Sequence, residues 1–168
     1  MASVKAKQLS EVVRMKVEEM KRLCKGLDEN TASRAPSGRW SPKEILSHLC
    51  GPEGIGPVPP VQKILQNDNP RLDLNPGNPF FTEKRSRMSL AELLKEFETE
   101  YGRMADLVAT LSDEQLARKV HVPAFKEAPM GEHLTLEVWV RTLADRHIAG
   151  HIEHMREIMQ QLGVKVPR

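Results

Sequence analysis

The sequence predicts an all-α protein, a four-helix bundle with a long Pro- and Gly-rich loop after the second helix. Aromatic residues make up only 4% of the 168 residues, and leucine, methionine and alanine are common, which favours helix over sheet. Four segments carry apolar residues at steps of three and four, the spacing of an amphipathic helix. The length suits one domain, and we expect a single helical domain over residues 1–168.

The first helix is expected over about residues 3–26. Charged residues separate its apolar positions, so that one face is apolar and the other is polar. The apolar face comprises Leu9, Val13, Val17, Met20, Cys24 and Leu27.

The second helix is expected to begin after Ser41, where residues 41–44 read Ser-Pro-Lys-Glu. This pattern is a capping box, in which the serine hydroxyl accepts from the Glu44 amide and the glutamate reaches back to the Ser41 amide. Trp40 and Ile45 occupy the two positions of a hydrophobic staple. A Gly-Pro pair at residues 51–52 is expected to end or bend the helix.

Residues 51–88 are rich in proline, glycine and asparagine, and they cannot form long regular elements. A short helix is expected within them at Val61–Gln66. Long ordered loops often cover a functional site, so this loop is a candidate cover.

The third helix begins at a second capping box, formed by Ser89 and Glu92. Its apolar face comprises Leu90, Leu94, Phe97, Tyr101, Met104, Val108 and Leu111.

Between the third and fourth helices we expect a short helical turn over residues 112–115 and then a loop through Pro123 and Pro129. His121 and His133 lie in this loop and are expected to be solvated.

The fourth helix is expected over about residues 135–162, with Gly163 as its C-terminal stop. Two histidines occupy consecutive positions of its apolar face, where leucine or methionine would be ordinary. The full set is Leu136, Val140, Leu143, His147, His151, Met155, Ile158 and Leu162.

His147 and His151 are four residues apart, so their rings stack on one face of the helix. A single histidine on such a face is usually a hydrogen-bonded core residue. Burying two side by side leaves ring nitrogens without partners, at about 1–3 kcal/mol for each unmet group. One divalent metal ion satisfies both rings. Spacing alone leaves the core and the metal interpretations about equally open.

Two more histidines lie near this pair. His48 is on the flank of the apolar face of the second helix, and its depth along the bundle depends on a helix direction that spacing does not specify. His154 follows His151 by three residues, which leaves it open as a third ligand, as a hydrogen-bond donor to a ligand, or as a surface residue.

Three further side chains carry groups that bind metals or protons. Cys24 fits the apolar face of the first helix and is expected to be a small buried hydrophobe. Cys50 points away from His48 on a helix and approaches the metal only if residues 51–52 distort the backbone. Glu53 is open as a ligand, as a general base or as a solvated loop residue.

Composition and charge exclude several classes of protein. The net charge is only +2, with basic and acidic residues interleaved, so a nucleic-acid partner is not expected. No run of about 18 apolar residues predicts a membrane span, and the first residues lack the apolar stretch of a secretory signal. Two cysteines in a chain of this length fit a reducing cytoplasm.

The segment GRW-SPKEILSHL, followed near the C-terminus by HIAGH, resembles the DinB-like (DinB/YfiT) superfamily. The connector LSDEQLARKV before the last helix is similar as well. The resemblance covers most of the chain in helix order, and it is most specific at Trp40–Leu49 and at His147–His151.

This resemblance implies a bundle of the DinB/YfiT type in which His48, His147 and His151 bind a divalent ion, which in relatives is often zinc or nickel. It implies an enzyme that activates a thiol or water there, as a thiol-dependent transferase or a hydrolase acting on a small molecule. A low-molecular-weight thiol as a further cofactor and a homodimer are also implied. Many relatives continue the second helix to an acidic residue, but residues 51–52 interrupt it here. Glu53 is therefore only a speculative catalytic base.

Two alternatives stay open beside the enzyme. The ion could instead stabilise a non-catalytic bundle or a stress-responsive binding module, which a sealed site with four protein ligands would indicate. A metal-free bundle that acts through protein contacts is the third hypothesis.

Overall fold

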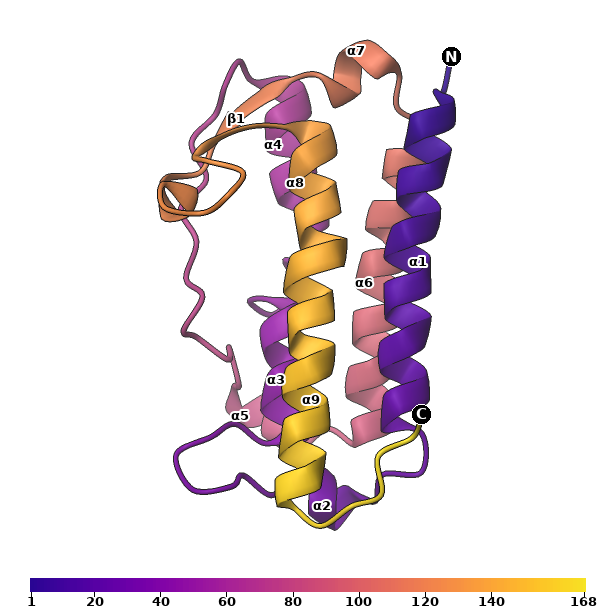
Figure 1. The fold of residues 1–168 in the computed structure, drawn as a ribbon, viewed down its shortest axis with the longest axis vertical. Coiled ribbons are helices and arrows are strands. Elements are labelled where there is room, and N and C mark those ends of the chain that lie inside the picture. Colours follow the sequence, from indigo (N-terminus) through magenta and orange to yellow (C-terminus); the bar gives the residue numbers. More distant parts are fainter.

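The computed structural model describes residues 1–168 as four helical columns, with a small two-stranded sheet beside one end (Figure 1). The column helices are α1 (Val4–Cys24), α3 (Pro42–Cys50) with α4 (Val58–Gln66), α6 (Leu90–Ala109), and the continuous run of α8 (Leu136–Thr142), η2 (Leu143–Ile148) and α9 (Ala149–Gln161). The smaller elements are α2 (Glu29–Ala32), α5 (Glu83–Ser86), α7 (Asp113–Leu116), β1 (Lys119–His121), the 3-10 turn η1 (Pro123–Phe125) and β2 (His133–Thr135). The predicted helical bundle is confirmed. None of its helices is both long and apolar enough to cross a membrane.

Helix α1 runs antiparallel to α6 and parallel to the last column. The Ser3 amide donates to the Leu111 carbonyl at 2.9 Å, which joins the beginning of α1 to the end of α6. Lys5 and Glu137, near the beginnings of α1 and α8, form an ion pair at 4.0 Å. The first and last helices of the bundle therefore point the same way (Figure 1).

Helix α3 runs antiparallel to α9, because Arg39, just before α3, pairs at 2.8 Å with Glu157 near the end of α9. His48 lies in the last turn of α3, so this direction brings it level with the middle of the last column. His147 and His151 lie at that level, on η2 and α9. Residue spacing alone does not specify the direction of α3. In the structure, α3 runs in the direction that brings the three histidines together.

Local sequence signals place the helix beginnings where the structure has them. Ser41 with Glu44 and Ser89 with Glu92 form both hydrogen bonds of a capping box, as predicted. Helix α3 ends at Gly51, which has φ of +70°, a left-handed conformation that favours glycine. All six apolar positions predicted for the first helix are buried, including Leu27, which follows the end of α1.

The last column differs from the predicted apolar face. Towards both of its ends, predicted positions are buried, namely Leu136, Val140, Met155 and Ile158. In the middle of the column the core positions are Ala144, Ile148 and Ile152, whereas His147 and His151 lie one position away and are half-buried. The cause is η2, a π-helical segment whose wider turns contain more residues than α turns. The histidines therefore flank the core and face α3.

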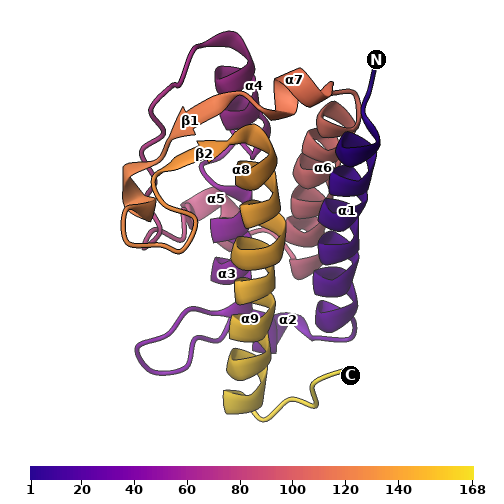
Figure 2. The ribbon, with the colours of Figure 1, turned by 45° about the horizontal axis from the view of Figure 1, so that its top comes forward.

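Residues 119–135 also differ from the prediction of a loop with solvated histidines. Strands β1 and β2 pair antiparallel (Figure 2). In that pairing, His121 lies opposite His133. Each strand has only three residues, too few for an alternating pattern to be recognisable in the sequence. His133 is exposed as expected, but His121 is only partly so.

Candidate metal centre

Three imidazoles converge between α3 and the last column, one from α3 and two from the last column. Ring nitrogens of His48, His147 and His151 all lie within 4.8 Å of one another. The ring centroids are 4.7–5.1 Å apart. His48 is only 6% exposed, and the other two are half-buried. The structure thus brings together the three residues that the family resemblance implies, and their role as metal ligands stays a prediction.

A loop carbonyl orients His48. Its Nδ1 lies 2.7 Å from the Asn78 carbonyl oxygen, which can only accept, so Nδ1 carries the proton and Nε2 has the free lone pair. The Asn78 side chain accepts from the Phe80 amide at 2.7 Å, which shapes the turn. Phe80 has a φ of +50°, a strained conformation of the kind found at functional sites. Loop 51–88 therefore contacts the site, through these two residues.

A buried arginine holds this loop against α3. Arg85 is 1% exposed, and its Nη1 is 3.1 Å from the Ser47 carbonyl oxygen and 3.2 Å from that of Phe80. Its Nη2 pairs with Glu96 of α6 at 2.7 Å. The Ser47 hydroxyl, next to His48 in the chain, donates to the Phe80 carbonyl at 3.0 Å. The backbone on both sides of the His48 ring is thus held by one network.

Aromatic rings and a fourth histidine surround the cluster. Trp40 stacks on His151, with centroids 6.2 Å apart and planes 9° apart, and Phe80 stacks similarly on His48 at 6.2 Å. The Nδ1 of His154 lies 3.4 Å from the Nδ1 of His151, so His154 is a hydrogen-bond partner of one candidate ligand. It is not among the three grouped nitrogens. This leaves the Nε2 of His151 for an ion.

The three imidazole rings of the cluster have lowered pKa values, so they are in the neutral form that binds metal ions. Burial, followed by the neighbouring histidines, lowers the pKa of His147 to about 4 and that of His151 to about 3. Burial also lowers the pKa of His48, against the opposing effect of the Asn78 hydrogen bond. The rings are therefore neutral at neutral pH, and their lone pairs are available. Neutral imidazoles suit zinc, nickel and similar ions, so these residues fit a divalent transition metal.

The other candidates lie apart from this cluster. Glu53 forms an ion pair with Lys84 at 3.7 Å and is not among the grouped side chains, so its role as a base stays a prediction. Cys50 is 1% exposed and is likewise outside the group. Burial raises the pKa of the thiols of both Cys24 and Cys50 to about 12, so both stay protonated.

We expect both thiols to resist alkylation while the protein is folded. An unperturbed cysteine has a pKa of about 8.5, so raising it to about 12 lowers the thiolate fraction at pH 8 about a thousandfold. Mass spectrometry after iodoacetamide treatment should show slow labelling in buffer and fast labelling in denaturant. Labelling of Cys50 at equal rates in both conditions, with the fold intact by circular dichroism, would contradict the burial of its thiol.

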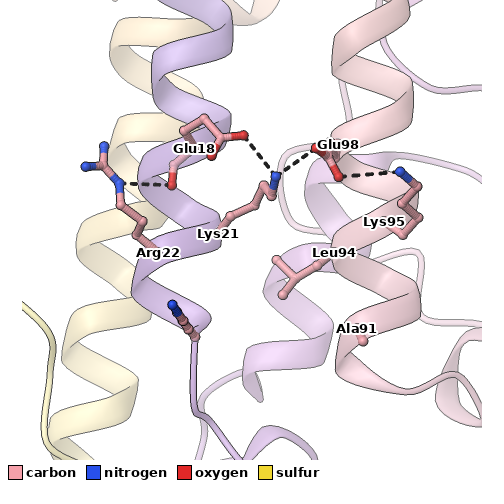
Figure 3. Close-up of a pocket in the computed structure, with 8 residues that line it drawn as sticks. Glu18, Lys21, Arg22, Ala91, Leu94, Lys95 and Glu98 are labelled. Carbon is pink, nitrogen blue, oxygen red and sulfur yellow. Dashed lines mark hydrogen bonds and ion pairs between the residues drawn. The ribbon is translucent and has the colours of Figure 1, made fainter.

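A hollow of about 430 Å³ between α1 and α6 contains none of these histidines (Figure 3). Lys21 donates there to Glu18 at 2.9 Å and to Glu98 at 2.7 Å. Lys95 lies 3.7 Å from Glu98 as well. With these charges already paired, we assign the hollow no role in the chemistry.

Comparison with known proteins agrees with this architecture. The sequence profile of the DinB superfamily matches residues 14–155. The chain is similar in structure to YfiT from Bacillus subtilis, described as a probable metal-dependent hydrolase with an unusual four-helix bundle topology. The TM-score is 0.75 at 18% sequence identity, over 98% of this chain and 92% of that one. At this identity the likeness concerns the fold. No curated protein matches the chain.

Proposed function

Since the chain belongs to the DinB superfamily, we propose that it is a metal-dependent enzyme that binds one zinc or nickel ion through His48, His147 and His151. The observation that carries this proposal is the convergence of their ring nitrogens within 4.8 Å of one another. The hydrogen bond from His48 to the Asn78 carbonyl supports it, because metal-binding histidines almost always donate their other ring proton in this way.

The number of ligands favours catalysis over a purely structural ion. Structural zinc sites are closed by four protein ligands, whereas catalytic sites have three and leave one position open. Only three side chains belong to this group, and neither His154 nor Cys50 is among them. An ion held by three neutral histidines would supply Lewis acidity, lowering the pKa of a water or thiol at the open position towards neutrality.

The chain's own residues then have defined tasks. His48, His147 and His151 would hold the ion, with the His48 ring oriented by Asn78. Trp40 stacks on His151, and Phe80 stacks on His48. These two aromatic rings would limit the access of water and offer apolar surface to a small substrate.

The nucleophile in this proposal is water or a low-molecular-weight thiol. Both cysteines are buried and protonated, so a thiol would have to come from a second molecule. Water would make the protein a hydrolase, as the description of YfiT suggests for that protein. A thiol would make it a transferase. Glu53 as the base, a homodimer and a cytoplasmic location remain predictions that accompany this proposal.

The first test is the metal content of protein purified without a polyhistidine tag. We expect elemental analysis to find zinc or nickel in the wild-type protein. The His147→Ala variant should contain one equivalent of metal less per chain. Substitution with Co²⁺ then distinguishes the nucleophiles, because a thiol at the open position produces a thiolate-to-cobalt charge-transfer band that water does not.

Two results would contradict the proposal. One is a wild-type protein whose metal content does not fall when His147 is replaced. The other is a cobalt spectrum that neither added thiol nor a change of pH alters, because a closed site with four protein ligands behaves in that way.

A further inference from the structure

We propose that His121, Glu132 and His133 form a second site for a divalent transition-metal ion, on the β1–β2 hairpin. One ligand atom from each side chain lies within 4.8 Å of the other two. No residue is shared with the histidine cluster in the bundle, and the hairpin lies beside the end where α8 begins (Figure 2). The site is independent of the proposed function.

The pairing of the strands places the two histidine rings face to face. His121 is opposite His133, and the next pair, Val122 with Glu132, shares a backbone hydrogen bond of 2.7 Å. Hydrogen-bonded and non-hydrogen-bonded pairs alternate in an antiparallel ladder, so His121 and His133 form a non-hydrogen-bonded pair, whose side chains are closer. Their centroids are 4.7 Å apart and their planes differ by 16°.

The Glu132 carboxylate contacts both rings. Its Oε2 lies 3.2 Å from the Nε2 of His121, and its Oε1 lies 3.9 Å from the Nε2 of His133. Ligand atoms around a tetrahedral ion with bonds of about 2.1 Å are about 3.4 Å apart. The side chains would therefore have to rotate out of the stacked arrangement to bring all three ligand atoms onto one ion.

The ligand set selects the class of ion. Two imidazoles and one carboxylate suit zinc, nickel, cobalt or copper, whereas magnesium and calcium prefer sites made of oxygen ligands alone. The carboxylate also supplies a negative charge, which the bundle site lacks. Arg71 forms an isolated backbone bridge with His121, and its side chain pairs with Asp73 at 2.9 Å.

The backbone beneath these ligands is held in place. The His121 amide donates to the Pro70 carbonyl at 2.9 Å, and its carbonyl accepts from the Leu72 amide at 2.9 Å. Val120 and Leu134 anchor the inner face of the hairpin in the core. The His133 side chain, by contrast, is 65% exposed. An ion here would exchange readily with solvent and would bind less tightly than one in the bundle.

The test uses untagged protein carrying His147→Ala, so that the bundle site is disabled. Equilibrium dialysis against Zn²⁺ is expected to find one bound equivalent in this variant and two in the wild type. Adding His133→Ala should weaken the remaining site at least tenfold. Lys119→Ala, an exposed change on the same strand pair, is the matched control and should leave its affinity unchanged. Copper in the same protein should show coupling to two nitrogens by electron paramagnetic resonance.

The outcomes separate this site from the bundle site. If the His147→Ala variant binds no zinc, or if His133→Ala leaves its binding unchanged, the hairpin site is refuted. In a third outcome, the wild type binds only one equivalent of zinc, which is lost in the His133→Ala variant and kept in the His147→Ala variant. That result would support the hairpin site and refute the proposed function. Because His133 is exposed, its replacement is not expected to disturb the fold, which circular dichroism checks.

Discussion

Replacing His147 by alanine is expected to lower the affinity of the bundle site for zinc or nickel by more than 100-fold and to abolish the metal-dependent activity. Losing only a hydrogen-bond partner of a ligand costs about 10- to 100-fold in affinity, and His147 is one of three candidate ligands. The variant should also lose the stabilisation by bound metal, which is about 4 kcal/mol at an ion concentration 1000 times the Kd. Competition with a chromophoric chelator and thermal melts with and without metal measure these effects.

Arg146→Ala is the matched control, because it is exposed, adjacent and in the same helical segment. It should leave the metal affinity unchanged. In the absence of metal, we expect His147→Ala to change the free energy of unfolding by less than about 1 kcal/mol. Collapse of the metal-free variant would indicate instead that His147 has a structural role in the bundle.

Replacing Arg85 by methionine is expected to lower the free energy of unfolding by about 3–5 kcal/mol, the cost of leaving one partner of a buried ion pair alone. Arg85 is 1% exposed, and its Nη1 also lies 2.5 Å from the Gly51 carbonyl oxygen. The change would leave Glu96 without its cation, and the carbonyls of Gly51 and Phe80 without this donor. Denaturant titration of the metal-free protein measures the loss.

Two further variants test this explanation. Arg87→Met, exposed and paired only with Glu83, should cost less than about 0.5 kcal/mol. Adding Glu96→Gln to Arg85→Met should recover part of the stability, because it removes the unpaired charge. If the double variant is no more stable than Arg85→Met alone, the unpaired carboxylate is not the source of the loss.

Much of the fold could be predicted because its signals are local. A capping box depends on residues three positions apart, so Ser41 and Ser89 indicate their helix beginnings without reference to the rest of the chain. The six apolar positions predicted for the first helix repeat regularly and are all buried. In α6, the spacing predicts Leu94 on the apolar face, but Leu93 is buried and Leu94 is only half-buried. A repeat of 3.6 residues does not decide between two neighbouring positions.

The features that the sequence did not reveal depend on distant partners or on irregular backbone. The π segment at Leu143–Ile148 shifts the buried face of the helix, although the three- and four-residue spacing of apolar residues continues through it in the amino-acid sequence. Strands of three residues are too short to show an alternation. The hairpin therefore appeared as a loop.

For the candidate site, the family resemblance implied the three histidines but not what supports them. Asn78 reaches His48 through a backbone carbonyl, which any residue has, and from 30 positions away in the chain. Arg85 resembles the other basic residues of a loop until its burial is known. Trp40 had a local explanation as part of a staple, and its stacking on His151 depends on the packing of α3 against α9.

The π segment lets the last column absorb one extra residue. Because a π turn holds about one residue more than an α turn, deleting Asp145, an exposed residue in that segment, would let it close into ordinary α-helix with the flanking helices in nearly the same orientation. Trp139 and Val140 before the segment would stay in the core, and His151 after it would still face α3. A one-residue deletion from the regular helix of α8 or α9 would instead rotate the residues on its two sides by about 100° against each other. The column therefore tolerates shortening by one residue at the π segment and not in the regular helices beside it.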